Sequence, residues 1–247
     1  MDAYDIQARH APVVFTILPA LIVAIAMVPG LGQTKIAAGS IAFIILAALP
    51  FVATRIARAA GRARQAALYA AWGGIPTTAM LRYRDTRLNP QTKRIFRERL
   101  SRFGTSFPIP DEYEEQRDAE EADIKVGAAM DEIRKRAKAK GIKAVHRENI
   151  NYGAARNAYG LRPFGLAMCL ISAAILALTI VLRGSFLPTA LELVVGMVIL
   201  IIAGAWIFGC TGDKVRHHGE AYALALFEAI ETVATRQAKK VDGQERK

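Results

Sequence analysis

Cations make up most of the chemically useful side chains of this sequence, and they are crowded into one stretch. Residues 55–102 contain 12 Lys or Arg and two Asp or Glu, a net charge of +10 in a chain whose total is +11. Guanidinium groups bind phosphates through paired hydrogen bonds, and rings such as those of Tyr83 and Phe96 can stack on nucleobases. We therefore predict that this stretch binds an anionic nucleotide or a single-stranded DNA oligomer. The predicted ligand-binding residues are Arg82, Arg84, Arg87, Lys93, Arg94, Arg97 and Arg99.

Anionic lipid is the alternative partner for clustered arginine. Arg55, Arg58 and Arg62 recur at spacings of three and four, which places them on one stripe of a predicted helix at headgroup level, and lipid anchoring is the favoured interpretation for these three. The stretch from Arg82 to Arg102 begins nearly thirty residues beyond the preceding apolar segment. That distance favours a soluble anionic ligand for the second group.

A second polar stretch, ENINYGAARNAYGLRPFG, stands directly before an uncharged segment. Its glycines permit positive φ or close backbone approach, and its Asn and Arg side chains offer several hydrogen-bonding groups. Two interpretations remain open: an elbow, flexible at Gly153 and Gly160, that couples ligand binding to the next helix, or an interfacial anchor. The residues of the predicted coupling elbow are Asn149, Tyr152, Arg156, Asn157 and Arg162.

Patterns typical of catalysis or metal binding are missing from the sequence. His146 and Glu148 lack a second ligand or base at a useful spacing, and His217 and His218 lack an acidic companion in a helical metal motif. The two cysteines lie in or at the end of apolar segments. We expect no enzyme, no catalytic or metal-ligating residue and no cofactor.

Four uncharged windows determine the predicted architecture. They cover residues 11–34, 36–54, 163–182 and 193–212, and each approaches the ~20 apolar residues that a helix needs to cross a bilayer. We predict an all-α membrane protein in which two transmembrane helical hairpins flank a helical cytoplasmic domain. The predicted parts are a cytoplasmic N-terminus (1–10), a first hairpin (11–54), a basic cytoplasmic domain (55–162), a second hairpin (163–212) and a cytoplasmic C-terminal tail (213–247).

Basic residues also predict the orientation in the membrane. Of 33 Lys and Arg residues, only Lys35 and Arg183 fall in the two short turns inside the hairpins. Because cytoplasmic segments carry an excess of Lys and Arg, both termini and the long middle segment are predicted to be cytoplasmic. The predicted location is the bacterial inner membrane.

The sequence predicts two helices in the segment between the hairpins. Asn89 and Pro90 are typical of a helix start, and Ile95, Phe96, Leu100 and Phe103 would form the apolar face of the helix that follows. A helix is also predicted over residues 118–140, because its acidic first half and basic second half complement the helix dipole. Val126, Ala129, Met130 and Ile133 would face inward in this second helix.

Two patterns resemble those of a widespread group of small bacterial membrane proteins. One is E-N-x-x-Y-G-x-x-R-N-x-x-G-L-[KR]-P-x-G, matched by Glu148, Asn149, Tyr152, Gly153, Arg156, Asn157, Gly160, Leu161, Arg162, Pro163 and Gly165. The other is P-T-T-x-x-L-R-x-R-D, matched by Pro76, Thr77, Thr78, Leu81, Arg82, Arg84 and Asp85. Over nearly its whole length the chain resembles the membrane effector of Hailong-type anti-phage defence. The resemblance implies a tetrameric channel held closed by short DNA oligomers from a partner nucleotidyltransferase, and loss of the oligomer opens the channel and kills the cell.

The residues themselves favour a pore over a transporter. No predicted span carries the mid-membrane ionisable group that a secondary transporter usually needs to couple to its ion. We expect a homo-oligomer that acts as a ligand-gated pore or ion channel and depolarises the membrane. The alternative is a non-conducting membrane scaffold that recruits a cytoplasmic partner or nucleic acid.

Overall fold

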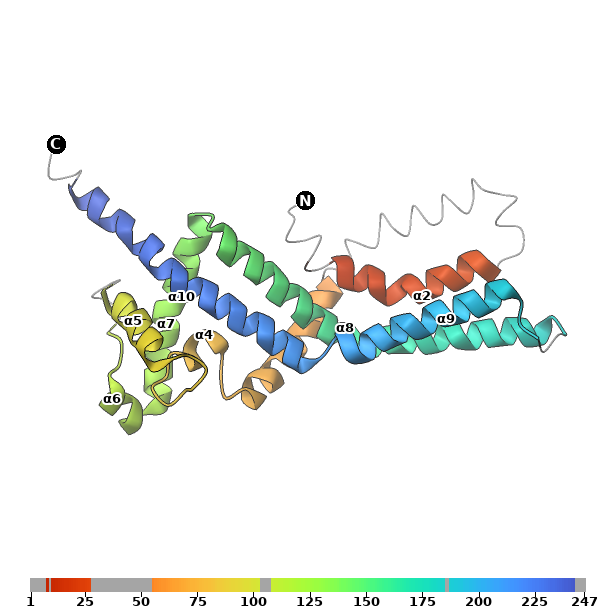
Figure 1. Cartoon of the computed structure of the whole chain (residues 1–247), viewed down its shortest axis with the longest axis horizontal. Coiled ribbons are helices and arrows are strands. Elements are labelled where there is room, and N and C mark those ends of the chain that lie inside the picture. The colour runs from red at the N-terminus through yellow and green to blue at the C-terminus, as the bar shows by residue number, and fades with distance from the viewer. Residues whose placement is uncertain (1–7, 9, 28–54, 103–107, 185–186, 243–247) are drawn as a thin grey trace. The chain divides into compact units, whose positions relative to one another are not determined.

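The computed structural model describes residues 8, 10–27, 55–102, 108–184 and 187–242. All regular structure in these ranges is helical, and they contain no strand, so the all-α prediction is confirmed for this part of the chain (Figure 1). The predicted second span, residues 36–54, lies outside the described residues. The chain divides into two compact units, an apolar unit (residues 1–66 and 153–215) and a polar unit (residues 67–152 and 216–247). The predicted cytoplasmic domain, residues 55–162, is therefore divided between them.

The long helices of the apolar unit lie side by side, and a shorter one meets them at an angle (Figure 1). They are α2 (Ala11–Met27), the later part of α8 (Lys143–Leu182), α9 (Ala190–Gly204) and residues 55–66 of a helix that covers residues 55–71. A π-helical turn, η2 (Ala205–Gly209), extends α9 and buries Trp206 completely. Val23, Leu176 and Ile199 belong to the same buried cluster.

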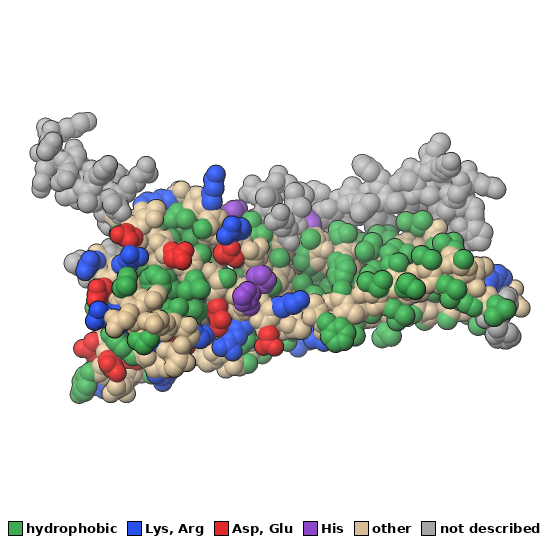
Figure 2. Space-filling model, viewed as in Figure 1, with side chains coloured by type: hydrophobic (Ala, Val, Ile, Leu, Met, Phe, Trp, Pro, Cys, Tyr) green, Lys and Arg blue, Asp and Glu red, His purple; other side chains and the backbone are tan. Residues whose placement is uncertain are grey.

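Two helices of the apolar unit, α8 and α9 together with η2, are long and apolar enough to span a membrane. The sequence predicted spans in these two places, but α8 begins twenty residues before Pro163 and contains this proline inside the helix. Pro163 lacks a backbone N–H and its ring crowds the carbonyl four residues earlier, so α8 continues through a position that is unfavourable for a helix. Many hydrophobic side chains of the later part of α8 and of α9 are exposed, and they are spread along this region of the surface (Figure 2).

The turn between α8 and α9 closes through its own side chains. Gly184 has a φ of 73°, a left-handed conformation that ends α8 without steric cost. Thr189 and Glu192 form a capping box at the start of α9, and Arg183 Nη1 donates to Glu192 Oε1 at 2.8 Å. Glu192 is therefore buried with a charged partner.

The polar unit packs short helices on long ones. Its helices are α4 (Pro76–Ala79), α5 (Pro90–Arg102), α6 (Glu112–Arg117), α7 (Ala119–Ala139), the start of α8, and α10 (Gly212–Asp242) from residue 216 onward. Leu81, Leu100, Ile133, Phe227 and Ile230 are almost completely buried in its core.

Both soluble helices predicted from the sequence are present. Val126, Ala129, Met130 and Ile133 of α7 are all buried, as predicted, and the Asp118 side chain caps the first turn. Asn89 accepts a hydrogen bond from Gln91 N at 2.9 Å, which confirms its capping role. In α5, Phe96 and Leu100 are buried but Ile95 is 45% exposed, so the predicted apolar face is wrong at Ile95. Phe103 lies outside the described residues.

Candidate functional site

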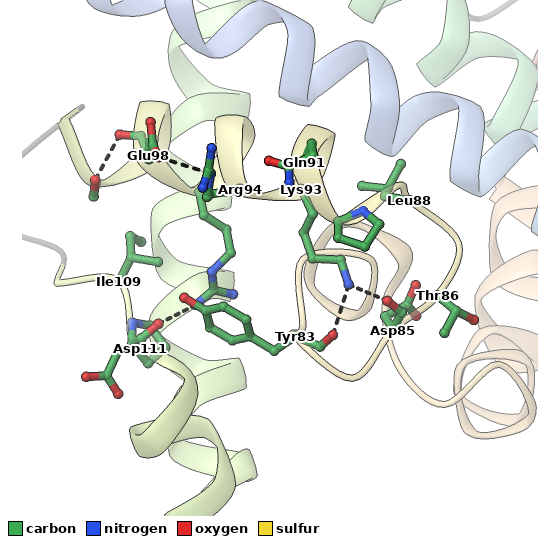
Figure 3. Close-up of a pocket in the computed structure, with 14 residues that line it drawn as sticks. Tyr83, Asp85, Thr86, Leu88, Gln91, Lys93, Arg94, Glu98, Ile109 and Asp111 are labelled. Atoms are coloured by element: carbon green, nitrogen blue, oxygen red, sulfur yellow. Dashed lines mark hydrogen bonds and ion pairs between the residues drawn. The ribbon is translucent and has the colours of Figure 1, made fainter.

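A pocket of about 740 Å³ opens in the polar unit between the loop at residues 80–89, helix α5 and the segment before α6 (Figure 3). The loop is irregular because α4 ends after one turn and α5 starts only at Pro90. Tyr83 and Asp85 line the pocket from the loop, and Lys93, Arg94 and Arg97 line it from α5. Three of the seven predicted ligand-binding cations therefore meet at one cavity.

Lys93 fixes the loop at residues 80–89 through hydrogen bonds to its backbone. Its ammonium group donates to the backbone carbonyl of Arg82 at 2.7 Å, to that of Tyr83 at 3.2 Å and to that of Asp85. The residue is only 5% exposed, and burial lowers the pKa of the Lys93 ammonium below its ordinary value. All three donors of this cation are thus directed at the loop backbone.

Arg97 forms the adjoining wall and is equally buried. Its guanidinium donates to the carbonyls of Leu81 and Pro110 and lies 3.8 Å from a carboxylate oxygen of Glu115. It also lies over the ring of Tyr83, 4.0 Å from the ring centroid, within cation–π range. Glu115 in turn accepts from the backbone N–H of Tyr83 at 3.0 Å. This network orients Tyr83, whose side chain remains 41% exposed.

Arg82 and Arg87 make ion pairs within the polar unit. Arg82 forms a two-pronged ion pair with Asp123, and this hydrogen bonding raises the pKa of its guanidinium despite the opposing effect of burial. Arg87 pairs with Asp85 and, at 3.1 Å, with Glu220. Burial alone would lower the pKa of Arg87 and raise that of Asp85, but the hydrogen bonds between them reverse both shifts.

The other three predicted ligand residues differ in their surroundings. Arg84 is exposed on the loop, and Arg99 pairs with Glu231 at 3.1 Å. Arg94 is also exposed, and its guanidinium lies 3.7 Å from Glu98 (Figure 3). Among the cations lining the pocket, Arg94 is the one exposed to solvent.

Three carboxylates share the pocket with the three cations, and the sequence prediction did not include them. They are Asp85, Glu98 and Asp111. The acidic partners Asp123 and Glu220 were missed too, because they lie 41 and 133 residues from the arginines they bind. No spacing rule along the sequence could have identified such distant pairs.

The structure contradicts a bend at the predicted elbow, whereas the coupling role of its residues stays a prediction. Residues 149–162 form regular helix within α8, so the chain does not bend at a loop here. A Cβ on Gly160 would overlap the backbone of Ala60 and Gly61, and a Cβ on Gly61 would overlap Asn157. Gly61 and Gly160 therefore permit close packing of the 55–71 helix on α8.

In the apolar unit, Arg156 binds the 55–71 helix and Asn157 binds the N-terminal segment. Asn157, 2% exposed, donates from Nδ2 to the carbonyl of Ala8 at 2.8 Å, and Arg156 Nη1 donates to Gln65 Oε1 at 3.2 Å. Arg162 is half-buried farther along α8.

In the polar unit, Tyr152 occupies a cluster of tyrosines. Its hydroxyl lies 2.9 Å from that of Tyr69, and its ring stacks parallel to that of Tyr222 with centroids 6.3 Å apart. Asn149 is half-buried one turn earlier on α8. The predicted elbow residues thus lie on one helix and take part in two separate packing clusters.

No group of three or more His, Cys, Asp or Glu side chains among the described residues is placed to hold a metal ion. Comparison with known proteins adds no assignment. No protein-family model matches the chain, and neither a curated protein nor a solved structure is significantly similar to it.

Proposed function

We propose that the chain is a multi-pass protein of the bacterial inner membrane, with the apolar unit in the bilayer and both termini in the cytoplasm. Leu170, Leu182, Leu200 and Phe208 expose at least 73% of their surface, which supports this proposal. Only 22% of the most apolar window of α8 and 28% of that of α9 are buried. Helices from a water-soluble core would be covered, whereas lipid accepts such surfaces without cost.

The polar unit would bind the anionic ligand that controls this membrane protein. In the pocket, Arg94 would contact a phosphate, and the exposed Tyr83 ring would stack on a base. Lys93 and Arg97 would add positive potential, although their donors are used by backbone carbonyls. Because three carboxylates line the same cavity and would repel phosphates, we propose a ligand with few phosphates, a nucleotide or a short single-stranded DNA oligomer, in place of a long polyanion.

Under the control of this ligand, the protein would act as a pore. A homo-oligomer, a tetramer by the resemblance to Hailong effectors, would enclose a path lined by apolar and hydroxyl side chains and would gate by dewetting. A partner nucleotidyltransferase would supply the ligand. Opening during infection would depolarise the inner membrane and kill the cell, so the protein would serve anti-phage defence without being an enzyme.

Single-channel recording in planar bilayers tests the pore and its control together. The wild-type current should change when a short single-stranded DNA oligomer is added or removed. Arg94→Glu should shift the oligomer concentration needed by at least about tenfold, because one contact to a phosphate is lost and repulsion is added. Arg134→Glu, which reverses an exposed charge on α7 outside the pocket, should leave the response unchanged. A silent protein that still binds the oligomer would favour the scaffold alternative.

A further inference from the structure

Several arginines of the polar unit differ in ion pairing from three arginines of the apolar unit. In the polar unit, Arg82, Arg87, Arg97 and Arg99 all pair with carboxylates. In the apolar unit, Arg55, Arg58 and Arg62, which we call the arginine stripe, are exposed, and no ion pair or hydrogen bond joins them to another described residue. The stripe therefore presents three neighbouring exposed guanidinium groups to an external phosphate.

Packing directs the stripe away from the protein. Ala57 and Gly61 are buried on the face of the 55–71 helix that meets α8, whereas the stripe repeats at spacings of three and four on another face. The contacts of Gln65 with Arg156 and of Ala60 with Gly160 run in opposite directions along the two helices, so the crossing is antiparallel. This register brings Arg162 level with Arg58.

The position of the stripe along the apolar unit identifies its ligand. Arg162 directly precedes the uncharged segment of α8 that we assign to the bilayer, so Arg58 lies at the same level beside that segment. From Arg55 to Arg62 the helix rises about 10 Å, comparable to the thickness of one headgroup layer. Among the described acidic residues of the apolar unit, Glu192 is paired with Arg183 at the far end of α8, and Asp213 remains.

We propose that the arginine stripe binds the phosphate groups of anionic phospholipids and that this binding stabilises the helix of residues 55–71 on α8. The proposal rests on the membrane insertion proposed above. Close packing at Gly61 and Gly160, together with the hydrogen bond from Arg156 to Gln65, holds one face of the 55–71 helix on α8. Headgroups bound along the stripe would add attraction on another face of the same helix, on the lipid side.

Lipid retention by the full-length protein tests this directly. Wild type and the triple variant Arg55→Gln, Arg58→Gln, Arg62→Gln are purified in detergent from the same membranes, and retained phosphatidylglycerol is measured by mass spectrometry. Retention should fall on the order of fivefold for each arginine replaced at low salt. The triple Lys variant should retain most of the lipid, because charge is kept. A control variant removes the same charge from α7 through Arg134→Gln, Lys135→Gln and Lys138→Gln. It should retain as much lipid as the wild type.

Added phosphatidylglycerol should also raise the unfolding temperature of the wild type more than phosphatidylcholine does, and this difference should vanish in the triple Gln variant. Equal phosphatidylglycerol retention by wild type and the triple Gln variant would overturn the proposal. A second result would also overturn the proposal: the wild type binds a single-stranded DNA oligomer without lipid and the triple Gln variant does not. The stripe would then be a nucleic-acid site. Alkaline carbonate extraction separates this failure from that of membrane insertion. If insertion fails, carbonate releases the wild type itself from the membrane fraction.

Discussion

At the scale of single residues, neighbouring cations of α5 have different roles. Lys93 is buried and donates to three backbone carbonyls of the loop, whereas Arg94, the next residue, is exposed at the pocket. A buried cation whose partners are all internal stabilises the fold, and an exposed one is available to a ligand. Of these adjacent positions, Lys93 stabilises the loop, and Arg94 is the one that we propose contacts the ligand.

Replacing Lys93 should therefore cost stability without directly removing a ligand contact. We expect Lys93→Met to lower the free energy of unfolding by about 2 kcal/mol, because three buried carbonyls lose their charged donor. Arg94→Met should change it by less than about 0.5 kcal/mol, since the side chain is exposed. Denaturant unfolding of both full-length variants in detergent, followed by circular dichroism, makes the comparison. Equal losses would show that the loop does not depend on Lys93.

Acid should weaken the polar unit through Asp85. Hydrogen bonds from Arg87 keep the pKa of Asp85 below its ordinary value of 3.8 even though burial acts in the opposite direction. The unfolded chain then binds the proton more tightly, so the stabilisation is complete above pH 3.8 and is lost as the pH falls through the lowered value. Asp85→Asn should flatten the fall in unfolding temperature in that window.

Glu148 should contribute to the acid dependence that remains in that variant. Its pKa is lowered by hydrogen bonds from Asn151 and Arg147, against burial, so its contribution is lost below its ordinary value of 4.5. Thermal scans at pH 5, 3.5 and 2.5 of wild type, Asp85→Asn and Glu148→Gln would separate the two carboxylates. An Asp85→Asn profile parallel to that of the wild type would show that Asp85 has no part in acid unfolding.

At the scale of elements, helix α8 determines most of the arrangement around residues 149–165. It is continuous from Lys143 to Leu182, and its small residues admit neighbours: the backbone of Ala60 and Gly61 at Gly160, and the ring of Trp206 at Gly165. Small residues at such positions are what close helix packing requires. If this helix couples ligand binding to a pore, it does so by shifts of packed helices, since it contains no loop to bend.

The close crossing of the 55–71 helix and α8 predicts that two glycine substitutions differ in their effect on stability. Gly160→Ala should destabilise the protein by about 1–3 kcal/mol, because its Cβ would overlap the backbone of Ala60 and Gly61. Gly204→Ala, also in a helix but with nothing within 4 Å of its Cβ, should be neutral or stabilise by up to about 1 kcal/mol. The unfolding temperature and the yield of assembled protein after purification would report both effects. A Gly160→Ala protein as stable as Gly204→Ala would contradict the close crossing.

At the scale of the whole molecule, the proposed topology can be tested without purification. Fusions of a reporter active only in the cytoplasm should function after Gln65, Gly141 and Lys247, because 31 of the 33 basic residues lie on that side in the proposed arrangement. A reporter active only outside should function at Gly32 and Ser185. An outside signal at Gly141 would overturn the orientation of the polar unit.

The sequence by itself determined the helical class, the two apolar segments at residues 163–182 and 193–212, helix α7 with its buried face, and the cap at Asn89. These features follow from composition, period and capping, which act over a few residues. Tertiary structure alone decided that Arg82 and Arg87 pair with Asp123 and Glu220, and that Gly160 packs against a backbone a hundred residues away. Such contacts depend on which helices pack against each other. A buried charge needs an opposite charge nearby, and a glycine in a helix crossing needs a close backbone, but the local sequence does not predict which residue will be that neighbour.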